Sequence, residues 1–191
     1  WLLAAAGQTG VLPTLRPYTA ATPLYLPNDP LASLPAEAKV KLLERLEGFA
    51  RAAQAKLAAL GLNQSRVVEP TGLSPANVST AKEMARIAAA AARYPQIAEI
   101  SSQAKAKVSV NGRVRELRNT NHLVGGKGWD IRLSKTGYTE EAGRCLTMRL
   151  RTEGKGVRHF VTVVLLDADG SAQCLADARR IRQSLGKLGA I

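Results

Sequence analysis

The chain has 191 residues, of which 46% are hydrophobic and only 4% aromatic, and its formal net charge is +12. This length allows one domain whose core is built from Ala, Leu, Val and Ile. No apolar run reaches the roughly 18–20 residues of a membrane-spanning helix, so no membrane span is expected. Thirteen Lys/Arg against five Asp/Glu lie between residues 104 and 160. This bias suits an anionic partner or a solvated basic face, and the absence of an aromatic platform or recognition helix argues against nucleic acid.

Residues 1–35 form a Pro- and Ala-rich segment that is interpreted as an unassigned segment or linker, because its prolines interrupt any long helix. The first seven residues fit either the tail of a signal peptide or the end of a buried helix. Because the sequence starts at Trp1, a processed chain or a fragment is expected. A single partial domain is predicted over residues 36–191.

The first predicted helix covers residues 36–60, where apolar side chains recur at intervals of three and four. Gly61 is placed to end it. Residues 66–75 are predicted to form a loop anchored by two valines. A second helix begins near Ser79 and Thr80, with capping-box spacing to Glu83, and ends before Pro95. A short helix is expected over residues 97–101.

From residue 105 the apolar period changes to two, which is typical of strands. Asn111-Gly112 predicts the turn of a hairpin. Three strands follow, and the second and third form an antiparallel pair. The almost wholly apolar run that starts at Phe160 predicts a central strand covered on both faces. The predicted strand ranges are 129–136, 144–152 and 157–167, and a basic helix is expected over residues 175–188. The order of elements indicates an α+β fold.

Cys145 and Cys174 lack the spacing of a zinc site. They are interpreted as two small buried residues, with a single disulfide left open as the alternative. His122 and His159 also lack ligand spacing, so no metal site and no cofactor are predicted.

Lys135-Thr136-Gly137 lies on a predicted strand, and this motif contributes to penicillin-recognising active sites. Over residues 47–186 the chain resembles the rear part of the low-molecular-mass penicillin-binding proteins, and within them the endopeptidase branch of the serine-type D-alanyl-D-alanine carboxypeptidases. Four segments in the right order carry this resemblance, over residues 68–81, 118–124, 133–149 and 175–182. The resemblance implies an incomplete transpeptidase fold like that of penicillin-binding proteins and β-lactamases, with a helical part, an antiparallel sheet and a C-terminal helix.

The family's chemistry is acyl transfer by the serine of a Ser-x-x-Lys motif. The resemblance implies that Lys135 supplies positive potential and that Thr136 hydrogen-bonds the substrate carboxylate. It also implies that Gly137 allows close approach of the substrate backbone and that the N–H of Tyr138 is one oxyanion donor. The expected partners are peptidoglycan stem peptides and β-lactams, and the expected location is the periplasm.

The nucleophilic serine is not found at the position where the resemblance places it. Ser-x-x-Lys occurs at Ser79–Lys82, Ser102–Lys105 and Ser184–Lys187, and Ser109–Asn111 fits Ser-x-Asn. Such short patterns arise by chance. Ser79 is interpreted as a helix cap and Asn111 as a turn residue.

An incomplete and inactive peptidase domain is therefore expected. The alternative is a non-catalytic interaction protein of the cell wall, and a basic nucleic-acid-binding protein is the third hypothesis. If strands of the family sheet are missing, an exposed sheet edge should lower stability or promote self-association.

Overall fold

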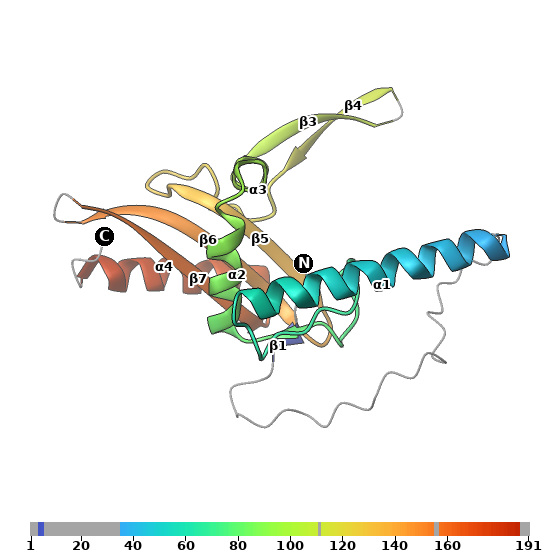
Figure 1. Cartoon of the computed structure of the whole chain (residues 1–191). Coiled ribbons are helices and arrows are strands. Elements are labelled where there is room, and N and C mark those ends of the chain that lie inside the picture. Colours follow the sequence, from blue (N-terminus) through green and yellow to red (C-terminus); the bar gives the residue numbers. More distant parts are fainter. Residues whose placement is uncertain (1–3, 6–34, 111, 155–156, 188–191) are drawn as a thin grey trace.

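The computed structural model describes residues 4–5, 35–110, 112–154 and 157–187. Most of the segment 1–35 lies outside the described residues, so its interpretation as a linker stays a prediction. The elements follow one another as β1 (Ala4–Ala5), α1 (Ala36–Ala59), β2 (Val78–Ser79), α2 (Ala81–Ala91), α3 (Pro95–Ser101), β3 (Lys105–Val110), β4 (Arg113–Arg118), β5 (Ile131–Thr139), β6 (Gly143–Gly154), β7 (Val157–Ala168) and α4 (Ser171–Lys187), as Figure 1 shows.

Helix α1 ends where the sequence predicts. Gly61 follows its last turn with a φ of +65°, a conformation that glycine adopts at little cost. The N–H of Gly61 donates to the carbonyl of Ala58 at 2.8 Å. The N–H of Leu62 donates to the carbonyl of Leu57 at 2.9 Å. This pair of bonds is a Schellman motif, and it satisfies carbonyls that the helix end would otherwise leave unpaired.

The apolar stripe predicted for α1 is buried only near its C-terminal end. There Leu57 packs with Leu62 and Val67 in a small cluster. By contrast, Val40 and Leu43 are 56% and 59% exposed. Figure 1 shows the N-terminal half of α1 extending away from the other described elements. The periodicity therefore identified the helix correctly, but it overstated the length of the buried face.

Strands β3 and β4 form the predicted hairpin. Their register runs from Lys105 opposite Arg118 to Val110 opposite Arg113, which leaves a two-residue turn. Gly112 in this turn has a φ of +73°, as two-residue hairpin turns require. Asn111 lies outside the described residues. The hairpin projects from the rest of the fold (Figure 1).

The main sheet has the antiparallel order β5-β6-β7. Side chains of a strand alternate between the two faces, and Leu146, Met148 and Leu150 of β6 are buried on one face. They pack against Cys174 and Ala178 of α4 in the larger core cluster. Helix α2 packs across the other face, against β6 and β7. The sheet is thus held between α2 and α4.

The prediction that the strand from Phe160 is central was wrong for the described part of the chain. There β6 is the middle strand and β7 lies at the edge. The apolar composition of β7 arises because its middle lies between two helices, with Val163 buried in the α4-side cluster. Its first residues pass beyond these helices, and Phe160 is 53% exposed.

The predicted α+β class is confirmed, because helices and antiparallel sheets are segregated along the chain. Among the described helices, none combines the length and the hydropathy that crossing a bilayer demands.

Candidate functional site

Strand β5 places Lys135, Thr136, Gly137 and Tyr138 in continuous register with β6. Lys135 lies opposite Thr147, and Gly137 lies opposite Cys145. Because β5 is the outer strand of the sheet, only one of its edges is paired within the described residues. The other edge carries no paired strand there, although α3 contacts it at Ser134, and an unpaired edge is the geometry of strand addition.

The direction of the backbone groups on this open edge follows from a single hydrogen bond. The N–H of Ser134 donates to Ser101 Oγ on α3 at 3.4 Å, so it points away from β6. Successive backbone N–H groups of a strand point to opposite edges. The N–H groups of Thr136 and Tyr138 therefore also point to the open edge, which is where an oxyanion donor would have to lie.

Lys135 lies at the solvent-facing side of this edge. Its Nζ donates to the carbonyl oxygen of Thr136. Partial burial beside the neighbouring cavity lowers the pKa of Lys135 from its usual range. The ammonium group is therefore held close to the strand edge rather than extended into solvent.

Thr136 is tied to the segment that precedes β5. Its Oγ1 lies 2.6 Å from Oγ1 of Thr120. The neighbouring Asn121 is 1% exposed, and its Nδ2 donates to Ser134 Oγ at 3.0 Å. The Oδ1 of Asn121 accepts the N–H of Leu123 at 3.1 Å, which closes a local turn. The 118–124 segment therefore supports the strand through hydrogen bonds on two consecutive residues.

A mainly apolar cavity of about 280 Å³ adjoins the motif. It is enclosed by the end of α1, the sheet-facing side of α2, α3 and one face of the sheet. Its lining comprises Lys56, Leu60, Met84, Ile87, Ala88, Ala90, Ala91, Tyr94, Ile97, Ser101, Leu133, Ser134, Lys135, Thr136, Gly137, Cys145, Thr147 and Leu166. Lys135, Thr136 and Gly137 all contribute to this lining, whereas Tyr138 does not. The guanidinium of Arg144 lies 4.0 Å from the ring centroid of Tyr138.

The structure separates the first Ser-x-x-Lys copy from this cavity and corrects its interpretation. Ser79 is buried and its Oγ lies 2.7 Å from Ser65 Oγ. The N-cap of α2 is Thr80, whose Oγ1 accepts the N–H of Glu83 at 3.2 Å. The interpretation of Ser79 as the cap was therefore wrong by one residue, because Ser65 holds the Ser79 hydroxyl inside the fold.

The other two copies do not form serine–lysine pairs at the motif. Ser102 Oγ donates to the carbonyl of Glu99 at 3.2 Å, while Lys105 pairs with Glu116 at 3.5 Å. Ser184 lies on α4, the helix that covers the opposite face of the sheet. Ser109 belongs to the projecting hairpin.

Both cysteines are free thiols in the structure. Burial raises the pKa of the Cys174 thiol and that of the Cys145 thiol. The interpretation of Cys174 as a small buried residue is confirmed, whereas Cys145 is only partly buried and lines the cavity.

Sequence reasoning missed the polar framework of the 66–83 region. The Glu69 carboxylate accepts the N–H groups of Gly72 and Ser74 at 2.9 and 3.1 Å and the Asn77 Nδ2 at 2.5 Å. Asn77 Oδ1 in turn accepts the N–H of Val68 at 2.7 Å. Eight residues separate Glu69 from Asn77, and neither helical nor strand spacing would pair them. The Pro-Thr-Gly turn between them was the available signal.

The family model described as D-alanyl-D-alanine carboxypeptidase matches residues 44–170. A D-alanyl-D-alanine endopeptidase of Pseudomonas aeruginosa is 44% identical over 139 residues, which are 72% of this chain and 44% of that protein. One from Escherichia coli is 41% identical over 138 residues, 71% of this chain and 43% of its own length. The chain thus spans less than half the length of these relatives.

Solved structures share the fold at lower identity. A variant of a Streptomyces DD-transpeptidase superposes with a TM-score of 0.63 at 22% identity, over 73% of this chain and 54% of that one. A penicillin-binding protein of Listeria monocytogenes in its cefotaxime-bound form gives a TM-score of 0.57 at 24% identity, over 71% and 53%. The expected partial transpeptidase fold is confirmed.

Proposed function

The chain belongs to the D-alanyl-D-alanine carboxypeptidase family, and on this basis we propose that it carries the substrate-binding strand of a serine peptidase that acts on the D-alanyl-D-alanine bonds of peptidoglycan peptides. The observation that carries the proposal is the open edge of β5, where the Thr136 and Tyr138 N–H groups point outward beside Lys135. An edge of this kind binds an extended peptide by backbone hydrogen bonds.

Each motif residue has a proposed role at this edge. Lys135 attracts the C-terminal carboxylate of the peptide, and the Thr136 hydroxyl donates a hydrogen bond to it. Gly137 carries no side chain that would hold the peptide away from the strand. The N–H of Tyr138 stabilises the oxyanion that develops when the amide is attacked. Stem peptides of peptidoglycan and β-lactams are the proposed ligands, and the periplasm is the proposed location.

The 191-residue chain is proposed to lack an activated nucleophile. In acyl transfer, a serine oxygen attacks the amide carbon while a neighbouring base takes the serine proton. Ser79 is enclosed by Ser65, and the Ser102 hydroxyl donates to a backbone carbonyl, so neither is positioned at Lys135. On this account the strand recognises ligand without completing the reaction.

The second candidate function is a non-catalytic protein that binds peptidoglycan through the same strand. The basic excess between residues 104 and 160 favours it, because acidic wall polymers would be attracted to such a surface. The nucleotide sequence upstream of the Trp1 codon separates the two candidates. An in-frame Ser-x-x-Lys favours the peptidase, and a start codon without one favours the binding protein.

The proposed strand is tested by equilibrium binding of a fluorescent peptide that ends in D-alanyl-D-alanine. We expect saturable binding by the full chain, weakened about tenfold or more in Lys135→Ala, because the carboxylate loses a charged partner. Lys82→Ala is the matched control, because Lys82 is exposed on α2 and does not line the cavity. Equal affinity of the two variants would refute the assignment of Lys135.

A further inference from the structure

A second cavity, of about 680 Å³, lies on the face of the β5-β6-β7 sheet that α2 covers. The ends of α2 and α3 form one wall, and β5, β6 and β7 form the other. The charged and aromatic residues of its lining are Arg93, Glu99, Arg132, Arg149, Arg151 and Phe160. We call this site the arginine groove. It shares no lining residue with the cavity at Lys135, although the two cavities adjoin along α2 and α3.

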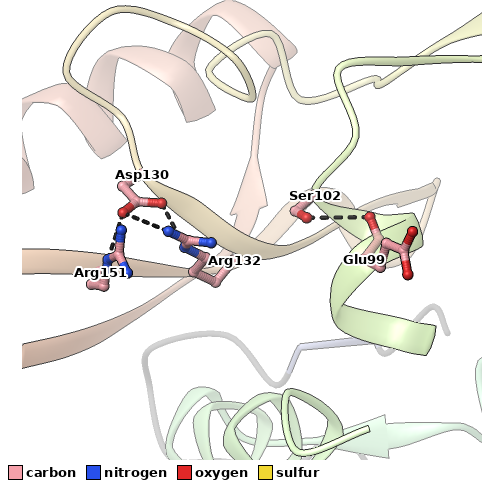
Figure 2. A network of polar contacts seen from close by, with 5 residues as sticks. All are labelled: Glu99, Ser102, Asp130, Arg132 and Arg151. Carbon is pink, nitrogen blue, oxygen red and sulfur yellow. Dashed lines mark hydrogen bonds and ion pairs between the residues drawn. The ribbon is translucent and has the colours of Figure 1, made fainter. Parts of the chain in front are cut away.

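Two of its arginines are fixed by one carboxylate. Asp130 accepts Arg132 Nε at 2.6 Å through Oδ1 and Arg151 Nε at 2.7 Å through Oδ2. The backbone N–H of Arg151 also donates to the Asp130 carbonyl at 2.8 Å. Figure 2 shows the two guanidinium groups converging on Asp130. Both are therefore held in place before any ligand arrives, which lowers the entropy cost of binding.

This group of three side chains keeps an excess of positive charge. Burial raises the pKa of Asp130, but its hydrogen bonds to Arg132 and Arg151 outweigh this effect and the pKa lies below its usual range. One carboxylate thus faces two guanidinium ions at neutral pH. The Nη groups of Arg151 make no hydrogen bond to another described residue, so they remain available as paired donors.

The third arginine is fixed by different partners. Arg149 Nη1 donates to Thr162 Oγ1 at 3.0 Å, and its guanidinium carbon lies 4.7 Å from the ring centroid of Phe160. The ring is 53% exposed and offers an apolar surface beside the charge. Arg93 adds a fourth cation, and its side chain forms no ion pair in the part of the chain that the structure describes. Glu99 adds one carboxylate to the same lining, and its negative charge offsets part of the positive charge of the arginines.

We propose that the arginine groove binds a ligand that carries at least two oxyanion groups, carboxylate or phosphate. Guanidinium groups present two parallel N–H donors that match either oxyanion, and here three of them are oriented by protein contacts. The volume of the groove lies in the range of ordinary small-ligand sites, so it accommodates several such groups at once.

The proposal is tested by calorimetric titration of the full chain with tripolyphosphate and, separately, with tricarballylate at physiological salt. We expect one saturable site for at least one of the two, and the preferred probe identifies the oxyanion. Arg149→Gln should weaken that binding about tenfold or more, since a charged donor pair is lost. Glu99→Gln should strengthen it, because a repelling carboxylate is removed.

Arg180→Gln is the control for general charge, because Arg180 is an exposed residue of α4 paired with Asp177. It should leave the affinity unchanged within about twofold. Thermal unfolding of each variant verifies folding, and Arg93→Gln replaces Arg149→Gln if the latter does not fold. Failure of both probes to bind, or equal weakening by Arg180→Gln and the groove variant, would overturn the proposal.

Discussion

The hydroxyl oxygens of Thr120 and Thr136 lie 2.6 Å apart, so the turn before β5 holds a hydroxyl of the Lys-Thr-Gly motif. The bond joins residues 16 positions apart and fixes the side chain of Thr136, a residue that contributes to the lining of the cavity. Positioned hydroxyls of this kind bind a carboxylate at a lower entropy cost than free ones do.

Removal of the Thr136 hydroxyl should therefore weaken ligand binding more than removal of the Thr120 hydroxyl. Thr136→Val deletes the proposed carboxylate donor, and we expect the affinity for a peptide ending in D-alanyl-D-alanine to fall about tenfold. Thr120→Val leaves that donor but frees its orientation, so a smaller loss is expected, and Thr120→Ser should restore affinity. Titration of the three variants with the fluorescent peptide measures both effects. Equal losses in Thr120→Val and Thr120→Ser would count against a positioning role for this hydroxyl.

Glu83 should make the fold sensitive to acid. It is 7% exposed, and burial raises its pKa, but hydrogen bonds from Ser65 and from the Gln64 N–H outweigh this and lower the pKa below 4.5. A lowered pKa in the folded state stabilises the protein above pH 4.5, and this contribution is lost as the pH falls through the folded-state value.

The measurement is the free energy of urea unfolding of Glu83→Gln and of the parent chain, from neutral pH down through pH 4.5 and below. At neutral pH the variant should lose about 1–3 kcal/mol of unfolding free energy, because the bonds to the carboxylate are weakened. Its stability should also depend less on pH. Glu44→Gln, at an exposed position of α1, should behave like the parent chain. A Glu83→Gln variant with the parent's pH dependence would contradict the assignment.

Two glycines of the α1 region should respond in opposite directions to the same substitution. Gly48 lies within the helix with no atom within 4 Å of an added Cβ. Gly48→Ala should therefore raise the unfolding free energy by about 0.5–1 kcal/mol. Gly61→Ala should lower it by about 1 kcal/mol or more, because φ of +65° disfavours a Cβ although there is space for one. Denaturant unfolding of both variants tests this, and a change of the same sign in both would show that backbone conformation does not decide the outcome.

The outer edge of β7 should promote self-association. Within the described residues this edge has no paired strand, and Val157 at its start is 54% exposed. Unpaired apolar edges favour pairing with another copy. Sedimentation velocity should detect oligomers that Val157→Lys reduces, whereas Val114→Lys, at an exposed valine of the separate hairpin, should not reduce them. A monodisperse monomer with a cooperative melt would contradict this expectation.

Local signals in the sequence located the elements of this fold well. Gly61 ends α1 and Gly112 closes the hairpin because their positive φ values are backbone preferences of glycine itself. The predicted strand 129–136 stopped short of Gly137 and Tyr138, although β5 continues to Thr139. The end of β5 depends on its pairing with β6, and the sequence of one strand carries no information about its partner.

Contacts between distant residues could not be predicted in the same way. Ser79 and Thr80 both offered a hydroxyl for the cap of α2, and Ser65, fourteen residues away, decided the choice. The edge position of β7 depends on the order of strands in the sheet, whereas apolar composition reports only burial. For the site, the motif residues were predicted from the resemblance, but the support from Thr120 and the arginine groove required the fold.

Whether the chain holds an activated serine is tested by incubation of the purified, folded chain with a fluorescent penicillin, followed by a denaturing gel and intact-mass measurement. We expect no covalent adduct, because no Ser-x-x-Lys serine among the described residues lies at the Lys135 strand. Reversible binding of the peptide to the same sample would show that the strand is intact. A covalent adduct would show that the chain does hold an activated serine, and peptide mapping would then identify it, with Ser102 as the first residue to examine.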